Sequence, residues 1–389
     1  MPPSTRIYLD HAATTPPLPE VVEAMQRAQR EAFGNPSSAH GFARRPHQLL
    51  DDAREFVRGT LCAAEVVFTG SGTEADLLGV LGAALARPRG RVLCGAADHP
   101  AVLRQRELLG RLGYELVTVP VRPEGDLDPE RLFDLLGHDV RVVSILHGHN
   151  ELGTLADLDQ LVDTVRHTAP QAHVHVDLVQ SYGKVPFDLD ATGVDSVAVS
   201  AHKLHGPRGV GFLALSSTAQ VHPVMPGGGQ EHGFRGGTEN VAGVHGLALA
   251  AEQVFSQLQA TADHCEALAA ACLARVQQVL PAATRLGHGT RRLPHILSLR
   301  LPGITGSTLL LRMSETHGVA FATGAACHGE QQSENHVHKA VGLDARASRE
   351  IVRLSFSRLN TAAEVEEAAG LLASEIGTLL GLAPHRAGA

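Results

Sequence analysis

The sequence predicts an α/β protein with a large domain built on a mainly parallel, seven-stranded sheet and a smaller α+β domain. Three observations support this expectation: the chain has 389 residues, short apolar runs alternate with helical patterns, and that pattern changes near residue 261. A chain of this length usually divides into more than one hydrophobic core. Alternating strands and helices are typical of parallel sheets, in which a helix connects each strand to the next.

Seven short apolar runs are the expected strands of the large sheet. They cover residues 65–69, 91–94, 116–119, 142–146, 174–178, 196–199 and 211–215. Helical patterns lie between several of these runs. A first helix is expected over residues 16–33, where prolines cluster at the start and apolar residues recur at helical spacing.

The pattern changes beyond residue 261. A long helix rich in alanine and leucine is expected over about residues 263–280, and short strands and further helices follow it. Thr361 and Glu364 stand three residues apart before the last helix, which fits a capping box. We therefore expect a large domain over residues 15–261 and a small domain made of residues 1–14 and 262–389.

Composition argues against several classes of protein. The formal net charge is −8 and no long basic run occurs, which argues against a nucleic-acid partner. No apolar stretch is long enough to span a bilayer, and the first residues contain no apolar signal segment, so we expect a cytoplasmic protein with no membrane partner. Five cysteines without a CxxC pair do not suggest a disulfide framework.

Two charged residues follow expected strands and suggest a cofactor site. A lysine at position 203 can form an imine with an aldehyde cofactor. Asp177 lies at the carboxyl end of a strand, where ligands of open α/β sheets bind, and can pair with a protonated pyridine nitrogen. Taken alone, Lys203 is more often a surface lysine and Asp177 is as often a cap, so the hypothesis rests on the two together.

A glycine-containing turn, residues 70–73 (GSGT), precedes an expected helix. Backbone N–H groups in such a turn, together with a helix N-terminus, can hold a phosphate. The turn lacks the lysine of a nucleotide-binding P-loop. Combined with Lys203 and Asp177, it indicates a cofactor that carries both an aldehyde and a phosphate.

Ten motifs resemble, in order and spacing, those of the cysteine desulfurase and selenocysteine lyase family. They are residues 8–16 (YLDHAATTP), 34–38 (GNPSS), 68–74 (FTGSGTE), 98–102 (DHPAV), 150–153 (NELG), 177–180 (DLVQ), 201–203 (AHK), 227–231 (GGGQE), 237–240 (GTEN) and 324–327 (GAAC). The resemblance runs from about residue 8 to the last helix. It implies a class-V aminotransferase-like protein with the type I fold of transferases that depend on pyridoxal 5'-phosphate (PLP).

The resemblance implies a role for each predicted cofactor-binding residue. Lys203 would hold PLP covalently, Asp177 would pair with the ring nitrogen and Gln180 would contact the ring hydroxyl. His99 would stack on the ring and assist proton transfer. The other cofactor-binding residues, mainly around the phosphate, would be Gly72, Thr73, Asn150, Ser200, His202 and, from a second subunit, Thr238.

The substrate would be bound by Asn35, Asn150 and Arg353, because a guanidinium binds a carboxylate through two parallel hydrogen bonds. Cys327 lies between small residues and a polar stretch, which is typical of a loop rather than of a buried cysteine. As a thiolate it would attack the substrate sulfur. The implied protein is a homodimeric cysteine desulfurase that converts L-cysteine to L-alanine, forms a persulfide on Cys327 and passes sulfur to an acceptor protein.

Three alternatives stay open at this point. The pair Cys327-His328 resembles some selenocysteine lyases, which act on L-selenocysteine. Leu178 stands where the family usually has alanine, and Leu77 stands near a usual asparagine, so a related protein with little activity is the second alternative. The third is a metal-dependent hydrolase, because His173, His175 and Asp177 alternate along one strand and face one way.

Overall fold

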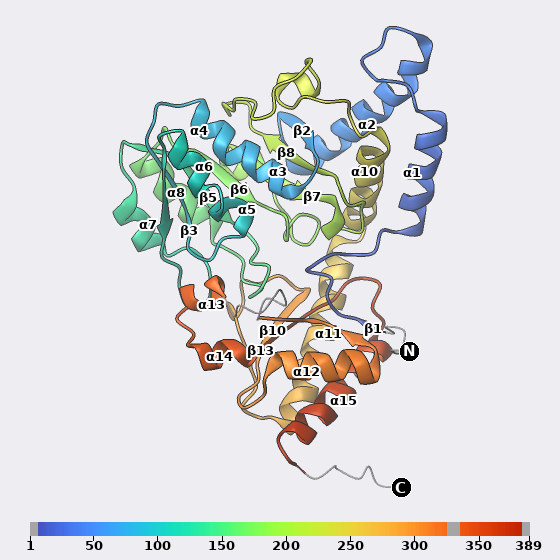
Figure 1. The fold of residues 1–389 in the computed structure, drawn as a ribbon, viewed down its shortest axis with the longest axis vertical. Coiled ribbons are helices and arrows are strands. Elements are labelled where there is room, and N and C mark those ends of the chain that lie inside the picture. The colour runs from blue at the N-terminus through green and yellow to red at the C-terminus, as the bar shows by residue number, and fades with distance from the viewer. Residues whose placement is uncertain (1–6, 325–334, 383–389) are drawn as a thin grey trace.

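The computed structural model describes residues 7–324 and 335–382, and a twisted seven-stranded sheet forms its centre (Figure 1). The strand order is β2 (Glu65–Thr69), β8 (Gly211–Leu215), β7 (Ser196–Ser200), β6 (His173–Asp177), β5 (Val140–Leu146), β3 (Arg91–Gly95) and β4 (Glu115–Val119). Strands β4, β3, β5, β6 and β7 are parallel, and β8 runs antiparallel to β7 and β2. The predicted, mainly parallel α/β sheet is confirmed.

Helices cover both faces of this sheet and bury its valine and leucine side chains (Figure 1). They are α1 (Pro19–Glu31), α2 (Arg44–Leu61), α3 (Gly72–Leu77), α4 (Ala83–Leu85), α5 (Pro100–Leu103), α6 (Arg106–Arg111), α7 (Pro129–Leu135), α8 (Leu158–Thr168), α9 (Leu189–Thr192) and α10 (Val241–Phe255). A π-helical turn, η2 (Leu78–Gly82), joins α3 to α4, so the three form one continuous helical segment. Such turns occur frequently at functional sites.

A second hydrophobic core lies below the first in Figure 1. Its antiparallel sheet has the order β12 (Ala322–Thr323), β13 (Ile351–Ser355), β10 (Ile296–Arg300) and β9 (Thr284–Arg285). Its helices are α11 (Leu258–Val279), α12 (Gly306–Arg312) and α15 (Ala362–Leu379). Helix α14 (Ala345–Arg349) lies outside this core, and α13 (His336–Ala340) packs in a small separate cluster with Ala97 and Leu152. Helix α15 begins with the predicted capping box, in which Thr361 and Glu364 bond each other's backbone N–H groups.

The N-terminal residues pack against this second core. Strand β1 (Ile7–Tyr8) pairs in parallel with β11 (Val319–Ala320), and Asp10 forms a bridge with Ser355. Helix α11 begins at Leu258, five residues before the predicted start, so the proposed boundary between residues 261 and 262 falls in its first turns. We keep the division into residues 15–261 and residues 1–14 with 262–389 as a proposal. No helix in the described ranges is long and apolar enough to cross a bilayer.

Candidate active site

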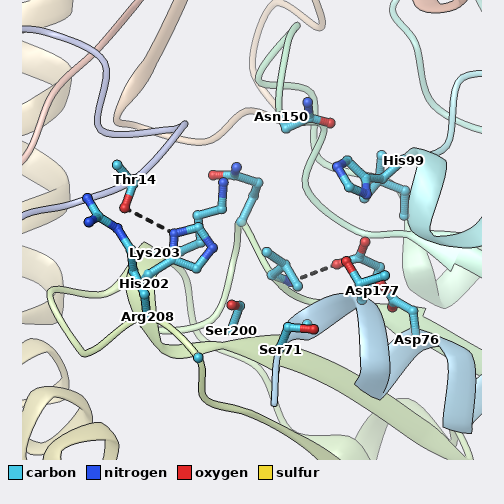
Figure 2. A pocket seen from close by; sticks show the side chains of 16 residues that line it. Thr14, Ser71, Asp76, His99, Asn150, Asp177, Ser200, His202, Lys203 and Arg208 are labelled. Atoms are coloured by element: carbon cyan, nitrogen blue, oxygen red, sulfur yellow. Dashed lines mark hydrogen bonds between the residues drawn. The ribbon is translucent and has the colours of Figure 1, made fainter. Parts of the chain in front are cut away.

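A cavity of about 420 Å³ opens at the carboxyl ends of β5, β6 and β7, beside the N-terminus of α3 (Figure 2). This is the position at which open α/β sheets bind ligands. Side chains from strands, turns and the N-terminal segment face it. The predicted site residues that it brings together are Gly72, Thr73, His99, Asn150, Asp177, Gln180, Ser200, His202 and Lys203.

Lys203 ends a short 3₁₀ turn, η3 (Ala201–Lys203), that follows β7 directly. Its Nζ donates hydrogen bonds to the carbonyls of Ala12 at 2.7 Å and Ala13 at 2.8 Å. Burial and, to a smaller extent, the nearby Arg353 together lower the pKa of this amine to about 8. A larger fraction of Lys203 is therefore neutral at pH 7 than for an ordinary lysine, and a neutral amine is the form that attacks an aldehyde.

Asp177 lies at the end of β6, buried at the floor of the cavity. Its Oδ1 accepts a hydrogen bond from the N–H of Val179 at 2.8 Å. Burial raises the pKa of this carboxyl to about 8, and the neighbouring Asp76 raises it as well. Gln180 lies one turn further and donates from Nε2 to the carbonyl of Ala12 at 2.8 Å. A buried carboxyl of this kind suits a ligand that brings its own positive charge.

The N-terminus of α3 approaches the cavity closely because residue 72 is glycine. A Cβ atom at Gly72 would lie 2.8 Å from Val179 Cγ2 and 3.1 Å from Ser200 Cβ. Ser71 caps the helix by accepting a hydrogen bond from the N–H of Glu74 at 3.1 Å. The first helical N–H groups, with Thr73 and Ser200 beside them, form a surface suited to a phosphate.

Two histidines lie on the walls of the cavity. His99 is the N-cap of α5, and its Nδ1 accepts from the N–H of Ala101 at 3.1 Å, so a neutral ring carries its proton on Nε2. Burial, with Lys203 and His336, lowers the pKa of His99 to about 4. His202 contacts Thr14 Oγ1 through Nδ1 at 3.1 Å, and burial lowers its pKa to about 4 too.

Arg353 lines an adjoining cavity of about 160 Å³ that shares Asn150 with the first. Its guanidinium donates to Asp10 Oδ1 at 2.7 Å and to the carbonyl of Asn150 at 2.8 Å. The Nε atom is buried without a hydrogen-bond partner among the described residues. Arg353 thus keeps one hydrogen-bond donor, Nε, beside the first cavity, although another of its N–H groups already bonds Asp10.

Besides Arg353, which lines the adjoining cavity, three predicted residues are not brought into the first cavity by the described part of this single chain. Asn35 and Thr238 are exposed and do not line it. Cys327 lies outside the described residues. Leu178, where the family usually has alanine, is fully buried in the main core, and it is Val179 that lines the cavity.

Four polar or charged residues that line the cavity have no role predicted from the sequence: Thr14, Ser71, Asp76 and Arg208. Thr14 and Ser71 lie within motifs that resemble the family, so their positions carried a signal. Asp76 is followed by two leucines and is indistinguishable from an ordinary helical residue. Arg208 follows Lys203 on a loop whose path a sequence pattern does not define.

The fold and this site agree with the comparisons with known proteins. The family model described as aminotransferase class-V matches residues 7–367. The chain is 32% identical to "Cysteine desulfurase IscS" of Dictyoglomus turgidum over 98% of this chain and 97% of the relative. It is 35% identical to "Cysteine desulfurase NifS" of Azotobacter vinelandii over 98% of this chain and 95% of the relative.

A solved structure described as "NIFS-LIKE PROTEIN" superimposes with a TM-score of 0.89 at 32% identity, covering 96% of this chain and 100% of that one. The chain therefore belongs to the class-V aminotransferase family and, within it, to the cysteine desulfurases. The family is PLP-dependent. The predicted resemblance and fold are confirmed. Because the chain belongs to this family, the histidines of β6 no longer suggest a metal-dependent hydrolase.

Proposed function

We propose that the protein is a PLP-dependent cysteine desulfurase that converts L-cysteine to L-alanine and takes up the sulfur on Cys327. One observation supports the proposal most strongly. Lys203, an amine of lowered pKa, and Asp177, a buried carboxyl of raised pKa, line the same cavity. Perturbed pairs of this kind are typical of catalytic sites.

The residues of the cavity fit PLP by their chemistry. Lys203 supplies the amine for the aldehyde, and Asp177 supplies a buried carboxylate for the ring nitrogen. The glycine-led start of α3 supplies backbone N–H groups for the phosphate. When bound, PLP supplies an electron sink for charge that develops on the substrate.

The protein's own groups would then move the protons and orient the substrate. Once substrate displaces it, the Lys203 amine is a base that can accept the proton of the substrate α-carbon. His99, with its proton on Nε2, is a neutral donor on the opposite wall. Arg353, whose Nε has no hydrogen-bond partner within residues 7–324 and 335–382, would bind the substrate carboxylate.

The other cysteines support Cys327 as the sulfur acceptor by their surroundings. Cys94, Cys265 and Cys272 are buried, and burial raises the pKa of each thiol, to about 12 for the last two. Cys62 is exposed, and the neighbouring Asp188 raises its pKa. A thiol of raised pKa is a poor source of thiolate at neutral pH.

Replacing Cys327 with alanine tests this assignment. Sulfide release from L-cysteine should fall to background, because no thiolate is left to attack the substrate sulfur, while the cofactor's visible band should persist. Some turnover of L-selenocysteine should remain, since selenium leaves carbon more readily. Mass spectrometry of the wild type after L-cysteine treatment should find a persulfide on Cys327.

Cys62→Ala is the matched control and should keep full sulfide release. Full desulfurase activity in Cys327→Ala would contradict the assignment. A wild-type protein that turns over L-selenocysteine but not L-cysteine would favour the lyase alternative, and one that binds PLP without turnover would favour the alternative of a related protein with little activity.

We further propose that the active unit is a homodimer. Asn35 and Thr238 are exposed on the single chain and stand outside its cavity, as expected if a second subunit uses them. Analytical ultracentrifugation of the PLP-loaded protein should give twice the chain mass, and a fully active monomer would refute this. A protein partner that accepts the sulfur and a cytoplasmic location stay predictions.

A further inference from the structure

A line of buried polar side chains crosses the interior behind the candidate active site. Asp76 Oδ1 lies 3.2 Å from His175 Nε2, and His175 Nδ1 lies 2.8 Å from Ser196 Oγ. Ser196 Oγ lies 2.7 Å from His173 Nε2. All four residues are at most 1% exposed, so these hydrogen bonds are shielded from water.

The two ends of this line reach different cavities. Asp76 lines the cavity that contains Lys203 and Asp177. At the other end, His173 Nδ1 is buried without a hydrogen-bond partner among the described residues and lies 4.0 Å from Asp195 Oδ2. Asp195 lines a polar cavity of about 590 Å³ near the amino ends of β6 and β7. A gap of 4.0 Å between polar atoms can be bridged by water.

The fold provides the space for this line. His175 and Ser196 are registered neighbours on β6 and β7, and His173 is two residues from His175 on the same face. The π-helical turn η2 packs over them, and a Cβ atom at Gly79 would clash with the His175 ring. A glycine in that turn is therefore what admits an imidazole between the helix and the sheet.

We propose that His173, Ser196 and His175 form a proton path that delivers a proton to Asp76 and so lets Asp177 stay ionised. This role rests on the proposed function, because Asp177 needs a negative charge only where a pyridine nitrogen binds. Two neighbouring buried carboxyls do not both ionise readily. A proton kept on Asp76 leaves the single negative charge on Asp177.

Each transfer conserves protons along the path. A proton from the polar cavity enters at His173 Nδ1, and His173 Nε2 passes its proton to Ser196 Oγ. Ser196 passes its own proton to His175 Nδ1, and His175 Nε2 gives one to Asp76. Both histidines change tautomer and remain neutral, and Asp76 gains one proton. Burial lowers the pKa of His175 to about 4 and that of His173 well below its usual value, which fits neutral rings throughout.

Charges around the two ends favour this protonated arrangement. Asp76 faces two acids, Asp98 and Asp177, as well as His175. Burial raises the pKa of Asp76 well above its usual value.

The far end of the path is also charged. His173 lies near Arg87, Arg166 and Asp195, and Arg166 pairs with Asp195 at 2.8 Å. With a proton on Asp76, His173 carries N–H on Nδ1 toward the Asp195 carboxylate. The opposite arrangement would point a bare nitrogen at that anion, which is unfavourable.

Histidine tautomers give a direct test in the PLP-loaded protein. We expect ¹⁵N NMR of histidine-labelled protein at pH 7 to show both His173 and His175 neutral and protonated on Nδ1. Ser196→Ala should switch His175 to the Nε2–H form, because Ser196 no longer accepts from Nδ1. The same variant should shift the pH midpoint of the cofactor's visible band by about one unit, the size expected of one altered charge interaction nearby.

Ser144→Ala is the matched control, because Ser144 is an equally buried serine on β5, registered beside His175, whose hydroxyl has no partner among the described residues. It should leave both tautomers and the midpoint unchanged, and Ser196→Thr should restore them by restoring the hydroxyl. Nε2–H tautomers in the wild type would overturn the proposal without touching the desulfurase assignment. If wild-type protein mixed with PLP shows no visible band, the proposed function is refuted. The histidine tautomers of the same protein then still decide the proton path separately.

Discussion

Each end of the central sheet carries a cavity, but the charged groups at the two ends are paired differently. At the amino end, Arg166 pairs with Asp195, and Arg141 donates to the carbonyls of Pro88 and His138. At the carboxyl end, Lys203 donates to two backbone carbonyls and Asp177 accepts one backbone N–H. The amino end thus satisfies its charges within the protein, whereas the carboxyl end holds an amine and a carboxyl suited to a ligand.

Burial explains why this difference matters for chemistry. It raises the pKa of Asp177 to about 8 and lowers that of Lys203 to about 8, from opposite directions. Both groups therefore titrate near neutral pH, where a small change in surroundings alters their charge. A paired surface carboxylate such as Asp139, which bonds Arg91 and has its pKa lowered to about 2, stays ionised throughout this range.

The largest expected effect comes from removing the carboxyl-end amine. Lys203→Ala should abolish the visible band that covalently held PLP gives and lower turnover by about 10⁴-fold, because both the anchor and the base are lost. Absorbance and sulfide release measure the two effects. Lys184→Met is a comparison variant, since burial lowers the pKa of Lys184 to about 8 as well and its Nζ donates to the Lys203 carbonyl at 2.6 Å, yet it lies outside the cavity. A visible band kept in Lys203→Ala and lost in Lys184→Met would reverse the assignment.

Asp177→Asn should reduce turnover by about 10²- to 10³-fold and stabilise the cofactor-free protein at pH 7. The native state keeps a proton up to a pKa of about 8 that the unfolded chain releases near about 3.9. Stability therefore falls as pH rises between these values, and the gain in Tm of the variant should vanish near pH 4.

Thermal unfolding of cofactor-free protein against pH measures this gain. Asp139→Asn provides a control of opposite sign, because its lowered pKa means that ionised Asp139 stabilises the native state. Its Tm should fall at pH 7. A Tm difference between Asp177→Asn and wild type that does not depend on pH would show that Asp177 is not a high-pKa carboxyl.

Gly79→Ala should lower the free energy of unfolding by about 1 to 3 kcal/mol, because its Cβ atom would displace the His175 ring from a packed interior. Gly59→Ala, at an exposed position of helix α2 with no atom near the added Cβ, should instead raise the free energy of unfolding by about 0.5 to 1 kcal/mol. Urea unfolding measures both. Equal effects of the two substitutions would mean that the turn does not confine His175.

The smallest effect is expected at the amino end. Arg141→Gln should change stability by no more than about 0.5 kcal/mol and leave sulfide release unchanged, since the guanidinium bonds only nearby carbonyls among the described residues. A steady-state assay checks this. A large loss of turnover in this variant would show that the cavity at the amino end also takes part in the reaction.

Much of the fold follows from local patterns in the sequence. The run at residues 211–215 coincides with β8, and the Thr361 capping box starts α15 as expected. The start of α11 was misplaced because its N-cap, Gln257, makes no side-chain capping bond and gives no sequence signal. The π-helical turn η2 was also missed, since a buried run of leucine, glycine and valine has no period that separates it from an α-helix.

The site divides in the same way. Lys203 and Asp177 could be predicted because each lies at or just beyond the carboxyl end of a strand, and the sheet then brings their positions together. The series of hydrogen bonds from Asp76 to His173 could not be predicted from the sequence. It depends on the register of β6 against β7 and on the packing of a helix over both strands. Alternation predicted that His173 and His175 share a face, but not that a serine hydroxyl bonds both of them.

The position of strand β1 affects when the active site can form during translation. Residues 7–10 are synthesised well before their partners, because β1 pairs with β11, and Asp10 binds Arg353, which is 343 residues further along the chain. At roughly 5 to 20 residues per second, about 17 to 70 s separate the two partners during translation. The carbonyls of Ala12 and Ala13 that hold the Lys203 amine lie just beyond this strand. The main sheet can therefore form on the ribosome before the wall beside Lys203, which is complete only after the residues around β11 and Arg353 are made.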